Sequence, residues 1–235
     1  MRAYLNALLE LVYPSRCPSC LKLTEGGFCA RCARLLPTVG NTFCRRCAKP
    51  TTAIVDDCRD CRGRDLYFDS ARAAWIYEGA ARDVIHAYKY ANQKSLAPAL
   101  AGYLAPLVDK IGLITWVPLT RHKTWNRGCN QAKLLATNLA RETGLPAVPL
   151  LRRVRATKDQ NQLDISARKT NVKDAFGLQG EATGADIILV DDVYTTGSTV
   201  AECAKTLKAG GAATVRVVTL ARTTFRPATD RRHLA

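Results

Sequence analysis

Four Cys-x-x-Cys pairs lie within the first 61 residues of this 235-residue chain, and their spacing constrains the fold more than any other feature. A Cys-x-x-Cys turn directs two thiolates toward one ion, and two such turns complete a tetrahedral zinc site. The four pairs therefore predict two structural Zn²⁺ ions. Because every ligand is a cysteine, neither ion keeps an open coordination position for catalysis. The predicted ligands are Cys17, Cys20, Cys29, Cys32, Cys44, Cys47, Cys58 and Cys61.

Disulfide bonds are the alternative to metal, and they require an oxidising compartment. The first quarter of the chain has too little apolar content to fold unaided, so bound zinc would supply folding free energy. Loop closure favours sequential pairing, in which the first two pairs hold one ion and the last two the other, while nested pairing stays open. The remaining cysteines, Cys129 and Cys203, are expected to be small buried residues and not nucleophiles.

The chain is strongly basic, with 35 Lys and Arg against 20 Asp and Glu and a formal charge of +15. This charge favours polyanionic partners, either nucleic acid or phosphorylated metabolites, although a solvated basic surface gives the same count. No apolar run is long enough to span a membrane. The first 14 residues contain Glu10 and no small-residue cleavage pattern, so we predict a short docking helix, not a signal peptide, and a cytoplasmic location.

Residues 187–199 read IILVDDVYTTGST and indicate one class of ligand. Four apolar residues predict a strand buried on both faces, Asp191 and Asp192 end it, and the helical pattern VAECAKTLKAGG follows. Free N–H groups at a helix start bind a phosphate monoester, and Gly197 permits close approach. The predicted phosphate cradle is Thr195, Thr196, Gly197, Ser198 and Thr199.

The two carboxylates cannot bind phosphate, so they suit ribose hydroxyls or a bridging Mg²⁺. The combination predicts a site for a ribose 5-phosphate. Its alternative is a solvated acidic turn that precedes an ordinary helix cap.

After Asp69 the predicted strands and helices alternate, which implies an α/β fold with a parallel sheet flanked by helices. Besides the strand 187–190, the predicted strands are residues 70–77, 113–119, 147–151 and 214–220, and the predicted helices are residues 81–91, 96–111, 128–141 and 199–209. Ligands of such sheets bind at the carboxyl ends of strands. The loop within VPLTRHKTWNRGCNQ follows one such end, and its Arg121 and Arg127 are predicted to attract a pyrophosphate leaving group; a solvated basic loop is the alternative. The polar segment 152–176 predicts a lid that excludes water, or else a variable insertion.

These motifs together resemble the ComF family of competence-associated proteins, which join a double zinc ribbon to a phosphoribosyltransferase-like domain. We accordingly divide the chain into residues 1–64, an N-terminal helix with the double zinc ribbon, and residues 65–235, a core like that of type I phosphoribosyltransferases. The resemblance covers nearly the whole chain. It rests on the four cysteine pairs, Lys89-Tyr90, VPL…R…RG.NQA from Val117 to Ala132, T..Q..L….R..NV..AF from Thr157 to Phe176, and LVDDVYTTGST.

The resemblance implies binding of phosphoribosyl pyrophosphate (PRPP) with Mg²⁺. It adds Lys89 and Tyr90 to the binding residues and makes Asp191 and Asp192 the candidate catalytic residues. It also implies a role in natural transformation, with single-stranded DNA and DNA-uptake proteins as candidate partners.

Two functions remain, a phosphoribosyltransferase of unknown acceptor and a non-catalytic PRPP sensor that binds single-stranded DNA. The retained basic loop favours the enzyme. Thr195 stands where purine-salvage enzymes carry an acidic residue, so a standard purine acceptor is disfavoured.

Overall fold

The computed structural model describes residues 16–24, 28–90, 93–120, 125, 128–155 and 172–224. The predicted N-terminal docking helix and most of the predicted lid lie outside these residues. Within the described ranges, no helix combines the length and the apolar character needed to cross a membrane.

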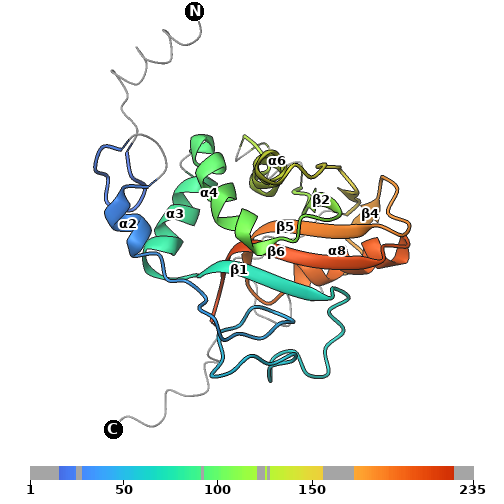
Figure 1. The fold of residues 1–235 in the computed structure, drawn as a ribbon. Helices are drawn as coiled ribbons and strands as arrows, with labels where there is room; N and C mark the ends of the chain where they lie inside the picture. The colour runs from blue at the N-terminus through green and yellow to red at the C-terminus, as the bar shows by residue number, and fades with distance from the viewer. Residues whose placement is uncertain are drawn as a thin grey trace, which may run out of the picture.

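A four-stranded parallel sheet forms the centre of the molecule, with the strand order β1-β6-β5-β2 (Figure 1). Buried residues run in long stretches through the two central strands, as expected for strands that are covered on both faces. The sheet confirms the predicted α/β class. Its strands are β1 (Ser70–Ile76), β2 (Leu113–Trp116), β5 (Asp186–Tyr194) and β6 (Thr214–Arg222).

Three helices cover one face of the sheet, and α8 covers the other (Figure 1). The helix predicted from residue 96 to residue 111 ends at Leu104, because Pro106 lacks the N–H that a continuing helix would use. The helical elements of the sheet domain are α3 (Gly79–Tyr90), η1 (Lys94–Leu96), α4 (Ala97–Leu104), η2 (Ala105–Leu107), α6 (Gln131–Thr143) and α8 (Ser198–Ala209).

Helix α6 begins later than the predicted Gly128. The Asn130 side chain caps it by accepting a hydrogen bond from the Lys133 N–H at 3.2 Å, and Gly128 itself has a φ of 65°, which a helix does not permit. Gly144 ends the helix with a φ of 76°. Cys129 therefore lies before the helix, and it is only partly buried, so the expectation of a buried residue is wrong for Cys129.

A second, antiparallel sheet pairs β3 (Leu151–Arg153) with β4 (Phe176–Leu178). The segment 152–176, predicted as a lid or an insertion, therefore begins and ends in short strands. Neither β3 nor β4 has a strand pattern in its own sequence, and each is stabilised by pairing with the other. The Arg153 guanidinium also lies over the Phe176 ring, 5.0 Å from its centroid. The strand predicted at residues 147–151 is reduced to one bridge between Ala147 and Ile114, followed by β3.

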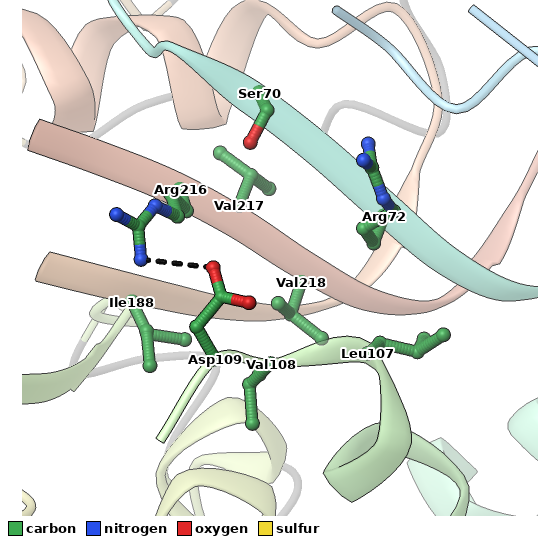
Figure 2. A pocket seen from close by; sticks show the side chains of 9 residues that line it. All are labelled: Ser70, Arg72, Leu107, Val108, Asp109, Ile188, Arg216, Val217 and Val218. Atoms are coloured by element: carbon green, nitrogen blue, oxygen red, sulfur yellow. Dashed lines mark ion pairs between the residues drawn. The ribbon is translucent and has the colours of Figure 1, made fainter. Parts of the chain in front are cut away.

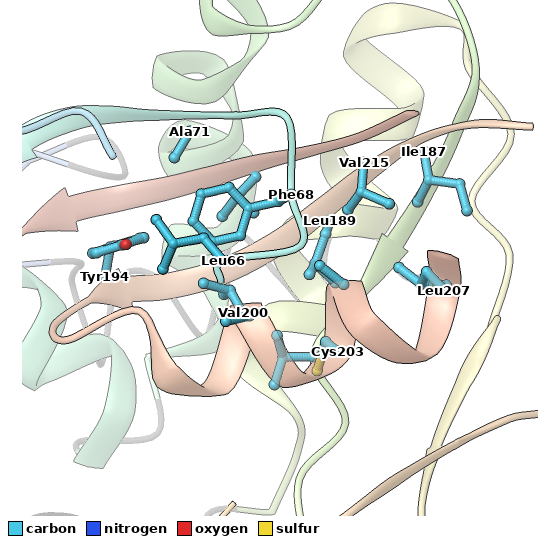
Figure 3. Close-up of a cluster of buried hydrophobic side chains, with 14 of the residues drawn as sticks. Leu66, Phe68, Ala71, Ile187, Leu189, Tyr194, Val200, Cys203, Leu207 and Val215 are labelled. Atoms are coloured by element: carbon cyan, nitrogen blue, oxygen red, sulfur yellow. The ribbon is translucent and has the colours of Figure 1, made fainter. Parts of the chain in front are cut away.

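Alternate residues of β5 face two separate hydrophobic cores. Ile187 and Leu189 pack toward α8, whereas Ile188 and Val190 pack toward α3, α4 and α6. Figure 3 shows the α8 side, where Cys203 points into the core from the helix. Cys203 is fully buried, which confirms the expectation of a small packing residue.

The two groups of cysteines relate differently to this sheet. The second cysteine site, which we define as Cys44, Cys47, Cys58 and Cys61, belongs to the same buried cluster as β5 and α8. The first cysteine site, defined as Cys17, Cys20, Cys29 and Cys32, includes the start of α2 (Ala30–Arg34). Beside it, Phe28 packs edge-on against Trp75 and Tyr103, with centroid distances of 6.3 and 6.0 Å. The second site thus shares a core with residues beyond the predicted division at residue 64.

A cavity of about 80 Å³ lies between β1, β6 and the segment after η2 (Figure 2). Arg216 pairs with Asp109 there, with 3.1 Å between nitrogen and oxygen. Ser70, Ile188 and Arg216 all lie near the amino ends of their strands. The cavity is therefore at the opposite end of the sheet from Asp191 and Asp192.

Candidate functional site

Asp191 and Asp192 lie where β5 loses one of its two neighbours. Pairing with β2 ends at Val190, whose carbonyl accepts from the Val117 N–H at 3.0 Å, whereas pairing with β6 continues to Tyr194. The prediction that the carboxylates end the strand is therefore right on the β2 side and wrong on the β6 side. Among the described residues, β2 therefore does not pair with β5 at the carboxylates.

Lys89 reaches from the carboxyl end of α3 to these carboxylates. Its Nζ lies 2.8 Å from Asp192 Oδ1, and the two side chains are only 17% and 15% exposed. Tyr90, the next residue, is half exposed, and its ring centroid lies 4.8 Å from that of His86. The structure therefore brings together Lys89 and Asp192, two predicted site residues that are far apart in the sequence.

The loop after β5 passes directly into α8. Gly197 has a φ of 78° and precedes the helix without a side chain that could cap it. The Thr196 and Ser198 hydroxyl oxygens lie 2.9 Å apart, and the Ser198 N–H also points to the Thr196 hydroxyl at 3.4 Å. Hydroxyls and helix N–H groups are thus gathered at one end of α8, as binding of an anion would require.

Gly197 is required by the fold as well as by the predicted ligand. A Cβ at this position would overlap the hydroxyl of Tyr194, a buried side chain that packs edge-on against Phe68. Loss of activity in a bulky Gly197 variant would therefore not distinguish blocked phosphate approach from a displaced Tyr194.

The loop predicted to hold pyrophosphate is fixed at both of its ends. Asn130 donates from Nδ2 to the Val117 carbonyl at 3.0 Å, and the Tyr88 hydroxyl donates to the Gln131 carbonyl at 3.0 Å. These bonds join the end of β2 and the end of α3 to the start of α6. Arg121 and Arg127 lie outside the described residues, so their predicted role stays a prediction.

Three arginines near this site are absent from the sequence motifs. Arg222 donates to the Thr195 carbonyl at 3.4 Å, and Arg64 donates to the Thr196 carbonyl at 2.8 Å. Arg153 donates to the Pro118 carbonyl at 3.5 Å, at the start of the predicted pyrophosphate loop. The sequence contains one indication of these contacts, which is that Arg222 follows the apolar residues of β6. The predicted strand 214–220 ends two residues before it.

Eight of the ten cysteines form two groups of four, and within each group all sulfur atoms lie within 4.8 Å of one another. A tetrahedron with Zn–S bonds of about 2.3 Å has edges of about 3.8 Å. The Sγ–Sγ distances agree: 3.6 Å between Cys20 and Cys29, and 3.7 Å between Cys47 and Cys58. Both groups therefore fit structural zinc, and the grouping is the sequential one that loop closure favours.

Within each group, the surroundings lower the pKa of some cysteines and raise that of others, such as Cys32 and Cys61. Burial opposes ionisation of Cys17, but backbone N–H groups at Cys29, Cys20 and Ser19 outweigh it and lower the pKa to about 6. A hydrogen bond with the Cys61 thiol lowers the pKa of Cys47 to about 5 against the effect of burial, and the charge of Arg222 adds to the lowering. Burial instead raises the pKa of Cys203 far above its usual range, so that thiol is unreactive.

Comparison with known families agrees with both parts of the chain. A double zinc ribbon domain matches residues 8–62, and a phosphoribosyl transferase domain matches residues 128–234. Competence protein F of Haemophilus influenzae is 33% identical over 178 residues, which cover 70% of this chain and 78% of that protein. The chain belongs to the competence protein F family. The family resemblance inferred from the motifs is thereby confirmed.

A second relative is the DNA utilization protein YhgH of Salmonella typhi, which is 40% identical over 153 residues. The match covers 60% of this chain and 66% of the relative, just under two thirds of its length. Among solved structures, an allosteric regulatory enzyme of purine biosynthesis matches 57% of this chain and 30% of its own, at 21% identity and a TM-score of 0.41. A score of that size does not bear on the assignment, which rests on the family models and on the relatives.

Proposed function

We propose that this member of the competence protein F family binds PRPP with Mg²⁺ and transfers the phosphoribosyl group to an acceptor. The observation that supports the proposal is the order of groups at one end of β5. Two carboxylates, a hydroxyl-bearing turn and the amino terminus of α8 follow one another there, with a lysine ammonium 2.8 Å from one carboxylate.

Each group has a role that its chemistry supports. Asp191 and Asp192 accept hydrogen bonds from the ribose hydroxyls, while Thr196, Ser198, Thr199 and the first N–H groups of α8 donate to the 5-phosphate. Mg²⁺, when bound, neutralises charge on the pyrophosphate. The Lys89 ammonium group leaves Asp192 and pairs with the pyrophosphate group of the bound ligand. Arg121 and Arg127 also attract this pyrophosphate.

In the transfer itself, the bond between ribose C1 and the pyrophosphate oxygen breaks, and pyrophosphate leaves with the electron pair. The acceptor forms the new bond to C1. Thr195 has no acidic group that could hold a proton of a purine ring, so we propose an acceptor other than a standard purine.

We further propose that the protein acts in DNA uptake, with single-stranded DNA and proteins of the uptake machinery as partners. The names of its relatives, competence protein F and DNA utilization protein, support this part. We propose a cytoplasmic location, because eight thiolate ligands persist best in a reducing compartment.

A non-catalytic PRPP sensor is the second candidate. Thr195 favours it, since the loop then lacks an acid or base beside the acceptor position. A sensor and an enzyme both bind PRPP, but only the enzyme releases pyrophosphate.

The test measures PRPP–Mg²⁺ binding by calorimetry and pyrophosphate release in the presence of nucleobases and small amines. We expect the double variant Asp191→Asn/Asp192→Asn to lose ~100-fold or more in affinity, because two charged hydrogen-bond acceptors are lost. Asp83→Asn, on an exposed position of α3, is the matched control. Binding without pyrophosphate release supports the sensor, and absence of binding by the folded wild-type protein contradicts both candidates.

A further inference from the structure

Arg222 links the second cysteine site to the loop that precedes α8. It is the last residue of β6 and only 4% exposed. One terminal nitrogen donates to Cys47 Sγ at 3.3 Å, and the other donates to the Thr195 carbonyl at 3.4 Å. Its guanidinium carbon also lies 4.7 Å from the centroid of the Tyr194 ring. One buried side chain thus contacts a sulfur of the cysteine site, the loop backbone and the last residue of β5.

Arg64 makes a second link of the same kind from the surface. It lies three residues after Cys61 and donates from Nη2 to the Thr196 carbonyl at 2.8 Å, and from Nη1 to the Asp60 carbonyl at 3.4 Å. The carbonyls of two consecutive loop residues are therefore each held by an arginine that is anchored at the second cysteine site.

The charge of the cysteine site gives these links their strength. A buried guanidinium requires a nearby negative charge. Among the described residues, the Arg222 side chain contacts a sulfur, a carbonyl and an aromatic ring. A four-thiolate zinc site carries net negative charge, because four anionic ligands exceed one divalent cation. With metal bound, the second cysteine site would therefore supply a counter-charge for Arg222.

The first cysteine site offers a natural comparison. The links to the loop come from the second site, whose cysteines share a core with Tyr194 and Val200. Phe28, beside the first site, instead contacts Trp75 and Tyr103 on the opposite face of the sheet.

We propose that Arg222 and Arg64 are positioning residues that couple the second cysteine site to the loop Thr195–Gly197, so that metal in this site sets the geometry that a phosphate ester meets. The identity of the ester rests on the proposed function, whereas the coupling concerns the loop alone. Because coupling between two sites is reciprocal, a ligand in the loop must also alter the metal site.

The first test uses the full chain without PRPP and follows amide hydrogen exchange in the peptide that covers residues 195–200. Arg64→Ala should speed exchange there by about tenfold, the size expected when one charged hydrogen bond is lost, while the zinc content stays unchanged. Arg62→Ala, on the same exposed turn, is the matched control and should leave exchange as in the wild type. Equal exchange in both variants would overturn the role of Arg64.

The second test replaces zinc by ¹¹³Cd and records the cadmium resonances of the two sites, with Cys17→Ser used to assign the first. PRPP–Mg²⁺ should shift the second-site resonance and leave the first in place. Arg222→Lys keeps the positive charge but cannot donate to Cys47 and Thr195 at the same time, so it should reduce that shift. Arg216→Lys, at the opposite end of β6, should not reduce it. Calorimetric binding of PRPP without any change at the second site would overturn the coupling.

Failure of the proposed function has a different signature. If the wild-type protein binds no PRPP, the exchange comparison still decides whether Arg64 holds the loop, because it needs no ligand. If Arg222→Lys fails to fold, the cadmium measurement is repeated with Arg64→Ala and its control Arg62→Ala. Both side chains are exposed, so these variants should fold.

Discussion

Lys89 Nζ lies 2.8 Å from Asp192 Oδ1, and this pair joins the end of α3 to the strand that carries the predicted ribose-binding carboxylates. Both side chains are mostly buried, so removal of one partner leaves the other charge poorly solvated. We expect Lys89→Met to lower the free energy of unfolding by ~1–3 kcal/mol.

Urea unfolding of a double-mutant cycle checks this prediction. The variant Lys89→Met/Asp192→Asn should cost less than the sum of its two single variants, because both charges are then absent. Strict additivity would show that the pair contributes no coupling energy to the fold.

The two cysteine sites should differ in what their loss does to the molecule. We expect two zinc ions per chain, and about one in Cys17→Ser with the melting temperature of the sheet preserved. Cys44→Ser should lower that temperature, because Cys44 is fully buried in the core that contains β5 and α8. From sequence alone, both substitutions would be expected to unfold only the first quarter. Elemental analysis with calorimetric melting checks the difference, and equal melting of both variants contradicts it.

Tyr194 and Gly197 should interact through one hydroxyl group. The Tyr194 hydroxyl is buried with no hydrogen-bond partner in the described part of the chain, so Tyr194→Phe should leave the free energy of unfolding unchanged or raise it by up to ~1 kcal/mol. Gly197→Ala should lower it by ~1–3 kcal/mol through positive φ and overlap with that hydroxyl. Chemical denaturation should show part of this loss recovered in the double variant, and no recovery would locate the strain elsewhere.

Asp69 should contribute stability that depends on pH. Burial raises the pKa of Asp69, but the Val215 N–H at 2.7 Å and the Lys208 ammonium at 3.0 Å outweigh it, and the net shift is downward. A carboxyl with a lowered folded pKa adds stability above its unfolded pKa of about 4 and loses it as pH falls through the folded value.

Asp69→Asn should therefore cost ~0.5–1 kcal/mol at neutral pH, a small value because the side chain is half exposed and screened. Urea midpoints of variant and wild type should converge as the pH falls below about 4. Parallel curves at all pH values would exclude this carboxylate as the source.

The uptake proposal predicts that the affinity for DNA falls steeply as the salt concentration rises. It also predicts that the affinity does not depend on the base sequence. Each phosphate contact to a single strand contributes about 0.7 to the slope of log affinity against log salt. Alanine at Arg31 and Arg34 of α2, or at Arg59 and Arg62 near the second cysteine site, tests which exposed surface makes such contacts. Fluorescence anisotropy should show a smaller slope for one pair, and unchanged slopes for both would place the DNA surface elsewhere.

The sheet and the carboxylate-to-helix turn could be predicted because their signals are local. The run Ile187–Val190 marks a strand covered on both faces, and Gly197 with its hydroxylated neighbours marks the turn into α8. The grouping of cysteines also follows from spacing and loop length.

The remaining features depend on contacts between distant segments. Nothing near Arg222 in the sequence shows that it reaches Cys47, 175 positions away. Leu151–Arg153 become a strand only because Phe176–Leu178 pair with them, and β5 extends past Asp191 only because β6 continues beside it. Such contacts have no periodic pattern that a single sequence displays.

The strand order also affects how the protein is made. β1 pairs with β6, and the bond from the Val215 N–H to Asp69 joins residues 146 positions apart. At translation rates of about 5–20 residues per second, β1 waits on the order of 10 s on the ribosome before its partner exists. All eight paired cysteines have been synthesised by then, so a growing chain can bind its metal long before β1 pairs with β6.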